Sequence, residues 1–181
     1  TAKYKKTILM PIGIDLDIFK EKNNIIKIPN SILSLGRIAP SKNIDTFIQV
    51  LKILKDKNIQ FSASIYGDAL PKDGYYLNKL KSQIKEFNLE KSLTFHNSLP
   101  NYKTPDIYNS YDIFVNLSSS GMYDKTIFEA MACGCIILAS NDNLKDKIDS
   151  RLIISNNKNI KDIYEKLLNI LSISNEEKKE I

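Results

Sequence analysis

The chain has 181 residues, which is enough for one well-buried domain and too few for two of ordinary size. Hydrophobic residues make up 43% and charged residues 26%, a balance that excludes a disordered chain. No apolar run approaches the roughly 18 residues of a membrane-spanning helix, and no signal-peptide pattern is found. Because the first residue is Thr rather than Met, we expect a piece of a longer protein.

The formal charge of +5 comes almost entirely from scattered lysines. Aromatic residues are not interleaved with a basic stripe, so no nucleic-acid partner is expected. The positive charge favours an anionic ligand, and it is compatible with a peripheral membrane contact as well as with simple solubility. Two cysteines and a single histidine make no zinc site, and we expect no bound metal. Cys133 and Cys135 are expected to be buried in a reducing, cytoplasmic setting.

The pattern of apolar residues predicts an N-terminal linker followed by one α/β domain. Residues 1–30 are expected to form the linker, with a first strand at 8–10 and a turn at 15–19. In the domain, 31–181, helices are expected at 44–54, 77–87, from 104 onward, 124–133 and 160–170. Strands are expected at 32–35, 61–66, 92–95, 113–117, 135–139 and 152–154.

Three capping features are expected to set the ends of these helices. Asn43 is a possible N-cap, and Thr104 is expected to cap a helix that has Pro105 at its first position. Gly134 is expected to end the helix 124–133 with a positive φ.

Strands that alternate with helices at this spacing predict a Rossmann-like, doubly wound parallel sheet. Ligands of such sheets lie at the carboxyl ends of the strands. The residues that follow the first four strands of the domain are therefore candidates for one common site. They are Arg37, Asp68, Asn97 and the segment 118–124.

The segment 118–140 is the most informative part of the sequence. It predicts a strand end, a Ser/Gly loop, a helix and a second strand. The loop leaves N–H groups unpaired at the helix start, where an anion can bind. Glu129 lies among small and apolar residues of this helix, so its carboxylate needs hydrogen-bond partners, such as ribose hydroxyls.

Familiar phosphate-binding motifs are missing from the sequence. Neither G-x-G-x-x-G after the first strand nor G-x-x-x-x-G-K-[ST] occurs. Arg37 and Lys42 instead stand five residues apart across a short loop, where both can converge on one diphosphate. An ordinary polar loop with two solvated cations explains the pair equally well.

Six segments together, spanning about residues 8–140, give the chain a resemblance to a known family. They contain PIGID, LGRIAPSKN, IYGD, TFHNSLP, YDIFV and FEAMACG, in that order. In this order they resemble the C-terminal, donor-binding domain of GT-B-fold retaining glycosyltransferases of family 4. The resemblance implies one Rossmann-like half of such an enzyme, with the N-terminal acceptor domain absent from this chain. It also implies transfer of a sugar from UDP-sugar or GDP-sugar to an unknown glycan, lipid or protein acceptor, without metal or other cofactor.

The family's donor-binding residues carry over onto matching positions of this chain. Arg37 and Lys42 match the pair that binds the diphosphate, and Glu129 matches the glutamate that holds the ribose. The remaining matches concern the base and the backbone contacts to phosphate, and they fall at Gly67, Phe95, Asn97, Leu99, Thr126 and Ile127.

The chain departs from the family where the first glutamate of E-x7-E is expected. Gly121 stands there, so the usual contact with the transferred sugar is in doubt, and Gly121, Asp124 and Lys125 become the candidates for that contact. Asp124 is expected either to meet the sugar hydroxyls, with Lys125 offsetting its charge, or to cap the helix and compete with phosphate for its N–H groups. A degenerate, non-catalytic binding module and a GT-B-fold epimerase or phosphorylase remain the alternatives.

Overall fold

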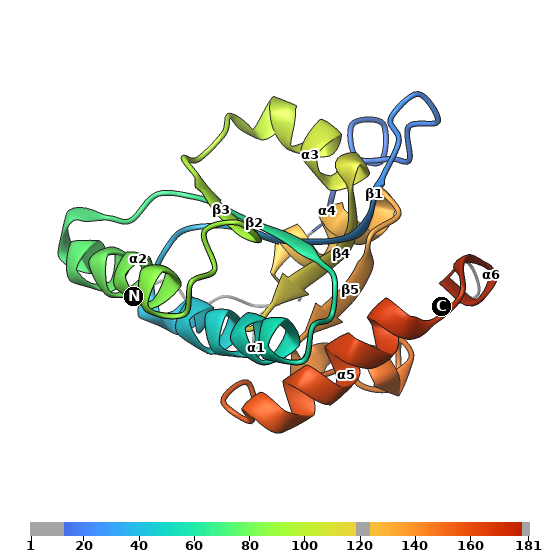
Figure 1. Cartoon of the computed structure of the whole chain (residues 1–181). Coiled ribbons are helices and arrows are strands. Elements are labelled where there is room, and N and C mark those ends of the chain that lie inside the picture. Colours follow the sequence, from blue (N-terminus) through green and yellow to red (C-terminus); the bar gives the residue numbers. More distant parts are fainter. Residues whose placement is uncertain (1–12, 119–123, 179–181) are drawn as a thin grey trace, which may run out of the picture.

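The computed structural model describes residues 13–118 and 124–178. Its strands form one sheet, in the order β3-β2-β1-β4-β5, and every neighbouring pair is parallel (Figure 1). The strand bounds are β1 Ile28–Leu35, β2 Ser62–Tyr66, β3 Leu93–His96, β4 Tyr111–Asn116 and β5 Ile136–Ala139. This is the α/β, Rossmann-like sheet that the alternating pattern predicts.

Helices cover both faces of the sheet. Figure 1 shows α1 and α5 on one side and α3 on the other, and α3 packs against α4. The helix bounds are α1 Ile44–Asp56, α2 Gly74–Glu86, α3 Thr104–Ser110, α4 Lys125–Ala132, α5 Ile160–Ser172 and α6 Asn175–Lys178. None of these described helices is long and apolar enough to cross a membrane.

The core lies where the apolar faces of the helices meet the sheet. In α1, Ile44, Phe47 and Leu51 recur at helical spacing and are all buried. In β1, Ile32 and Leu33 point to opposite faces and are both fully buried, because helices cover the sheet on two sides. The continuous apolar runs of the central strands follow from this double burial.

The order of the strands determines where the candidate site lies. The chain runs outward from β1 to β2 and β3, and then returns to place β4 on the other side of β1. The carboxyl ends of β1 and β4 are therefore neighbours, and the loops that follow them lead away in opposite directions. Such a reversal leaves a crevice between the two loops.

Two glycines allow β1 and β2 to come close at this edge. The N–H of Gly36 donates to the Tyr66 carbonyl at 3.0 Å, and the N–H of Gly67 donates to the His96 carbonyl at 3.1 Å. Gly67 has a φ of +155°, and a Cβ at this position would lie 1.9 Å from the carbonyl oxygen of Gly36. A side chain does not fit there without moving the backbone.

The expected strand at 152–154 is wrong. Ser150–Leu152 forms a turn of 3-10 helix, and only one bridge, between Ala139 and Ile153, joins the following residues to β5. The Asp149 side chain accepts hydrogen bonds from the backbone N–H and the guanidinium of Arg151, and this local turn competes with a ladder.

Two of the expected caps differ from the structure. Asn43 does precede α1, but in the left-handed conformation and without a side-chain cap; its amide donates instead to the Leu117 carbonyl at 2.7 Å. Thr104 is the first residue of α3 rather than its cap, which places Pro105 second, and its hydroxyl donates to the Asn101 carbonyl. Gly134 ends α4 with a φ of +74°, as expected.

The expected boundary of the linker also changes. The strand β1 begins at Ile28, so the domain includes the last residues assigned to the linker. The turn at 15–19 is confirmed by a hydrogen bond from the Phe19 N–H to the Asp15 carbonyl. The strand expected at 8–10 lies outside the described residues.

We expect Gly67→Ala to lower the free energy of unfolding by about 2–4 kcal/mol, because the added Cβ meets the Gly36 carbonyl. Thermal and urea denaturation followed by circular dichroism measure the effect. Gly74→Ala is the matched control, since nothing lies within 4 Å of its Cβ position and Gly74 has a helical φ of −58°. This control should change stability by less than about 1 kcal/mol. Equal effects of the two substitutions would contradict the close approach.

Candidate functional site

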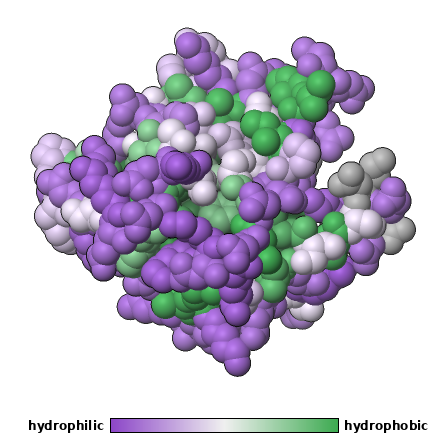
Figure 2. Space-filling model, viewed as in Figure 1, coloured by the Kyte–Doolittle hydropathy of each residue, from purple (hydrophilic) through white to green (hydrophobic). Residues whose placement is uncertain are grey.

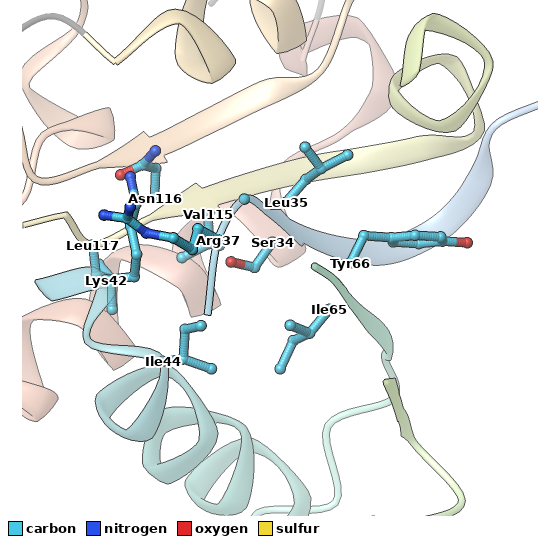
Figure 3. Close-up of a pocket in the computed structure, with 11 residues that line it drawn as sticks. Ser34, Leu35, Arg37, Lys42, Ile44, Ile65, Tyr66, Val115, Asn116 and Leu117 are labelled. Carbon is cyan, nitrogen blue, oxygen red and sulfur yellow. The ribbon is translucent and has the colours of Figure 1, made fainter. Parts of the chain in front are cut away.

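Two cationic side chains lie at the carboxyl edge of the sheet, between the loops that follow β1 and β4. Arg37 and Lys42 belong to the first loop, and Asn116 ends β4. All three line a narrow pocket, and Figure 3 shows their nitrogen-bearing ends close together. The structure thus brings together the two cations that the sequence singles out.

A wider hollow of about 320 Å³ opens beside Arg37. It extends from the ends of β1 and β2 to the loop between β3 and α3. Its lining residues are Leu35, Gly36, Arg37, Tyr66, Gly67, Asp68, Ser98, Leu99 and Thr104. Arg37, which lines both the narrow pocket and this hollow, is exposed and forms no hydrogen bond or ion pair with the described residues. Its five donors are therefore available to a ligand.

Asp124 is the most densely hydrogen-bonded side chain of the site. It is the N-cap of α4, and its carboxylate accepts from the Thr126 N–H at 3.3 Å. The Lys42 ammonium lies 2.7 Å from Oδ2, and the amide of Asn116 donates to the same oxygen at 3.0 Å. The hydroxyls of Thr126 and Ser118 complete the set, at 2.8 and 3.2 Å.

These contacts determine the charge of Asp124. Burial alone would raise the pKa of this carboxyl, but the hydrogen bonds and the charge supplied by Lys42, Asn116 and Thr126 outweigh it and lower the pKa to about 2. Asp124 is therefore ionised at neutral pH. The expectation that Lys125 offsets the charge of Asp124 is wrong. The Lys125 ammonium lies 3.9 Å from Glu129, and the ammonium that pairs with Asp124 is that of Lys42.

Glu129 is buried one turn into α4, as its apolar neighbours predict. The hydroxyl of the fully buried Tyr108 donates to Oε2 at 3.2 Å. Burial raises the pKa of Glu129 above its usual range, and the hydrogen bond from Tyr108 only partly opposes this effect. A carboxylate held in this way gains from further hydroxyl donors.

Two backbone amides in the first turn of α4 already have acceptors. The Thr126 N–H donates to the Asp124 side chain, and the Ile127 N–H donates to the Asp124 carbonyl at 3.1 Å. An anion that takes the Thr126 amide must therefore exchange with Asp124. Gly121, the position of the missing glutamate, lies outside the described residues.

The loop expected to contact the base follows β3. Leu99 lines the wider hollow, Asn97 is exposed, and Phe95 packs against the core. His96 stacks on Tyr66 with ring centroids 4.2 Å apart, and burial lowers its pKa. Gly67 and Leu99 thus line the same hollow, whereas Phe95 is not among the residues that line it.

Two contributing side chains were not identified from the sequence. Asn116 donates to Asp124, and Tyr108 donates to Glu129. Ser118, which belongs to the candidate segment 118–124, also donates to Asp124. For Asn116 a signal existed, because it is a polar residue at the end of an otherwise apolar strand. Tyr108 gave no such signal, since its hydroxyl partner is 21 residues away. Among the described residues, no group of three or more His, Cys, Asp or Glu could hold a metal ion.

Comparison with known proteins decides the family. Residues 15–181 match the family described as glycosyl transferases group 1. The chain belongs to this glycosyltransferase family. The match covers more than half of the chain and includes both loops of the site, which confirms the resemblance carried by the six motifs.

Curated relatives of this glycosyltransferase domain are longer than the chain. Mannosylfructose-phosphate synthase of Agrobacterium fabrum is 30% identical over 106 residues, which are 57% of this chain and 23% of the relative. Alpha-monoglucosyldiacylglycerol synthase of Streptococcus pneumoniae is 26% identical over 162 residues, which are 83% of this chain and 36% of the relative. The chain therefore spans well under half of the curated relatives that it matches.

Solved structures share the fold of the domain. The C-terminal domain of a glycosyl transferase group 1 protein, LpcC of Francisella tularensis, has a TM-score of 0.77 at 23% identity, with 89% of each chain covered. Anabaena Alr3699/HepE, solved in complex with UDP and glucose, has a TM-score of 0.75 at 18% identity and covers 92% of this chain and 47% of its own. The fold is thus that of the C-terminal half of a GT-B enzyme.

The low pKa of Asp124 predicts how stability depends on pH. An unfolded Asp has a pKa near 3.8, so the folded-state value of about 2 means that Asp124 stabilises the fold above pH 4. This contribution, about 1–2 kcal/mol after solvent screening, is lost as the pH falls from about 4 to about 2. Urea denaturation of the wild type and of Asp124→Asn should therefore differ at pH 7 and converge near pH 2. A difference that stays constant with pH would contradict the assignment.

Proposed function

We propose that this domain binds a nucleoside diphosphate sugar in the crevice between the β1 and β4 loops. The observation that carries the proposal is the convergence of Arg37 and Lys42 beside the start of α4, with Glu129 buried one turn further on. Two cations and a helix N-terminus suit a diphosphate, and a buried carboxylate suits ribose hydroxyls. UDP and glucose in the structure of Anabaena Alr3699/HepE, which has the same fold, support this choice of ligand.

The wider hollow is proposed to hold the base. It lies next to Arg37, and its lining combines backbone at Gly36 and Gly67 with the apolar side chain of Leu99. An apolar wall with nearby backbone polar groups suits a flat heterocycle. The expected contacts of Phe95 and Asn97 remain proposals of the same kind.

In a protein that also carries an acceptor-binding half, we propose that the domain donates the sugar to an acceptor with retention of configuration. Arg37, Lys42 and the dipole of α4 would stabilise the negative charge that develops on the departing diphosphate. The segment before β1 suits contact with such a half, because it exposes Leu16, Ile18 and Ile26. Figure 2 shows apolar surface at the upper right, where Figure 1 draws this segment in blue.

A non-catalytic binding module is the second candidate. This chain has Gly121 at the position where the family motif has its sugar-contacting glutamate. Asp124, the nearby carboxylate, already forms an ion pair with Lys42. Assay of the full-length protein for sugar transfer separates this candidate from the enzyme.

We expect Arg37→Ala to weaken the nucleoside diphosphate that this chain binds by ten- to a hundredfold, since a charge-assisted phosphate bond is worth about 1.5–3 kcal/mol. Calorimetric titration with UDP, GDP and ADP makes the measurement and identifies the base. Arg151→Ala is the matched control, because Arg151 is an exposed arginine paired with Asp149. If a folded sample binds none of the three nucleotides, or if both arginines matter equally, the proposed site is wrong.

Glu129→Gln is expected to weaken UDP about tenfold, because the amide replaces one acceptor for the ribose hydroxyls. The effect should vanish for 2′,3′-dideoxy-UDP, which lacks these hydroxyls; GDP or ADP and the matching analogue are used if another base binds. Glu165→Gln on the surface of α5 is the control and should change neither affinity. A loss that is equal for both ligands would place Glu129 away from the ribose.

A further inference from the structure

The carboxylate of Asp124 occupies a position surrounded by donors. Its side chain is only 14% exposed, and its partners are an ammonium, a backbone N–H, an amide and two hydroxyls. A phosphate oxygen uses the same kinds of donors at a helix N-terminus. Asp124 thus supplies, from within the chain, an anion beside the cation that the proposed ligand needs.

Lys42 contacts Asp124 and also lines the pocket that is proposed to hold the diphosphate. Its ammonium binds Asp124 and the Ser118 hydroxyl, at 2.7 and 2.9 Å, and it also lines the narrow pocket with Arg37. A diphosphate that reaches Lys42 must share the ammonium with Asp124 or displace it. Asn116 and Thr126 continue to hold the carboxylate in either case, so its negative charge stays beside the bound ligand.

We propose that Asp124 makes the site discriminate against the free nucleoside diphosphate in favour of the nucleotide sugar. The proposal rests on the proposed function. At neutral pH the terminal phosphate of a nucleoside diphosphate carries up to about one more negative charge than the diester of a nucleotide sugar, because its second pKa is about 6. A fixed anion at short range penalises that extra charge. Asp124 would therefore speed the release of the nucleoside diphosphate after transfer.

Substitution of Asp124 tests the proposal directly. Asp124→Asn and Asp124→Ser both remove the charge and keep a residue that can cap α4. Each variant is titrated with the nucleoside diphosphate that binds the wild type best among UDP, GDP and ADP, and with its glucose ester. We expect the free diphosphate to bind about tenfold more tightly, the size of one screened charge interaction, and the glucose ester at most about threefold.

The strand β4 offers a matched control at its opposite end. Asp112 forms an ion pair with Lys178 at 2.6 Å, and its side chain is 15% exposed, close to the 14% of Asp124. Asp112→Asn therefore removes a comparable charge and ion pair far from the site. It should leave both affinities unchanged, and circular dichroism verifies that each variant is folded.

Several outcomes would overturn the inference. Equal tightening of both ligands would make Asp124 a general competitor without discrimination. Weaker binding of the glucose ester alone would place Asp124 on the sugar. Nucleotide binding that depends on Arg37 but does not tighten in the Asp124 variants would refute the inference and leave the proposed function intact. Absence of nucleotide binding in the folded wild type would refute both the inference and the proposed function.

Discussion

The adjacency of β1 and β4 is the constraint on which the rest of the structure depends. Because the two strands are parallel neighbours, their carboxyl ends lie together, while their connections run to opposite faces of the sheet. This geometry places Arg37 and Lys42 opposite the start of α4. The close approach of Gly36 and Gly67 extends the same edge toward β3. A ligand that spans the carboxyl edge of the sheet therefore lies near two cations, a helix N-terminus and an apolar hollow.

Most of the fold could be predicted from the sequence because its elements obey local rules. The helical spacing of Ile44, Phe47 and Leu51 specifies α1, and the apolar run in β4 specifies a strand buried on both faces. The same rules predicted a strand at 152–154, which the structure does not contain. Three apolar residues are too few to distinguish a strand from a covered turn, and the hydrogen bonds between Asp149 and Arg151 settle the backbone there.

The candidate site was predictable in its cations and less so in its carboxylates. Arg37 and Lys42 stand out because a short loop brings them together without help from distant residues. The partner of Asp124 is Lys42, 82 positions away, and no local pattern indicates that pair. Nearness in sequence instead suggested Lys125, which the helix turns toward Glu129. The contact between Tyr108 and Glu129 is not predictable from a local pattern either, because it depends on how α3 packs against α4.

The two carboxylates of α4 differ because their surroundings supply different numbers of donors. Asp124 has an ammonium, an amide, a backbone N–H and hydroxyls, which outweigh burial and keep it ionised. Glu129, among the described residues, receives a hydrogen bond from Tyr108 and lies 3.9 Å from the Lys125 ammonium, and burial outweighs both and raises its pKa. A ligand hydroxyl that donates to Glu129 would oppose the effect of burial on this carboxyl, whereas a ligand phosphate would lie beside Asp124, a carboxylate that is already held by several donors. In the proposed complex, α4 would therefore favour the ribose of the nucleotide through Glu129 and disfavour additional negative charge on its phosphates through Asp124.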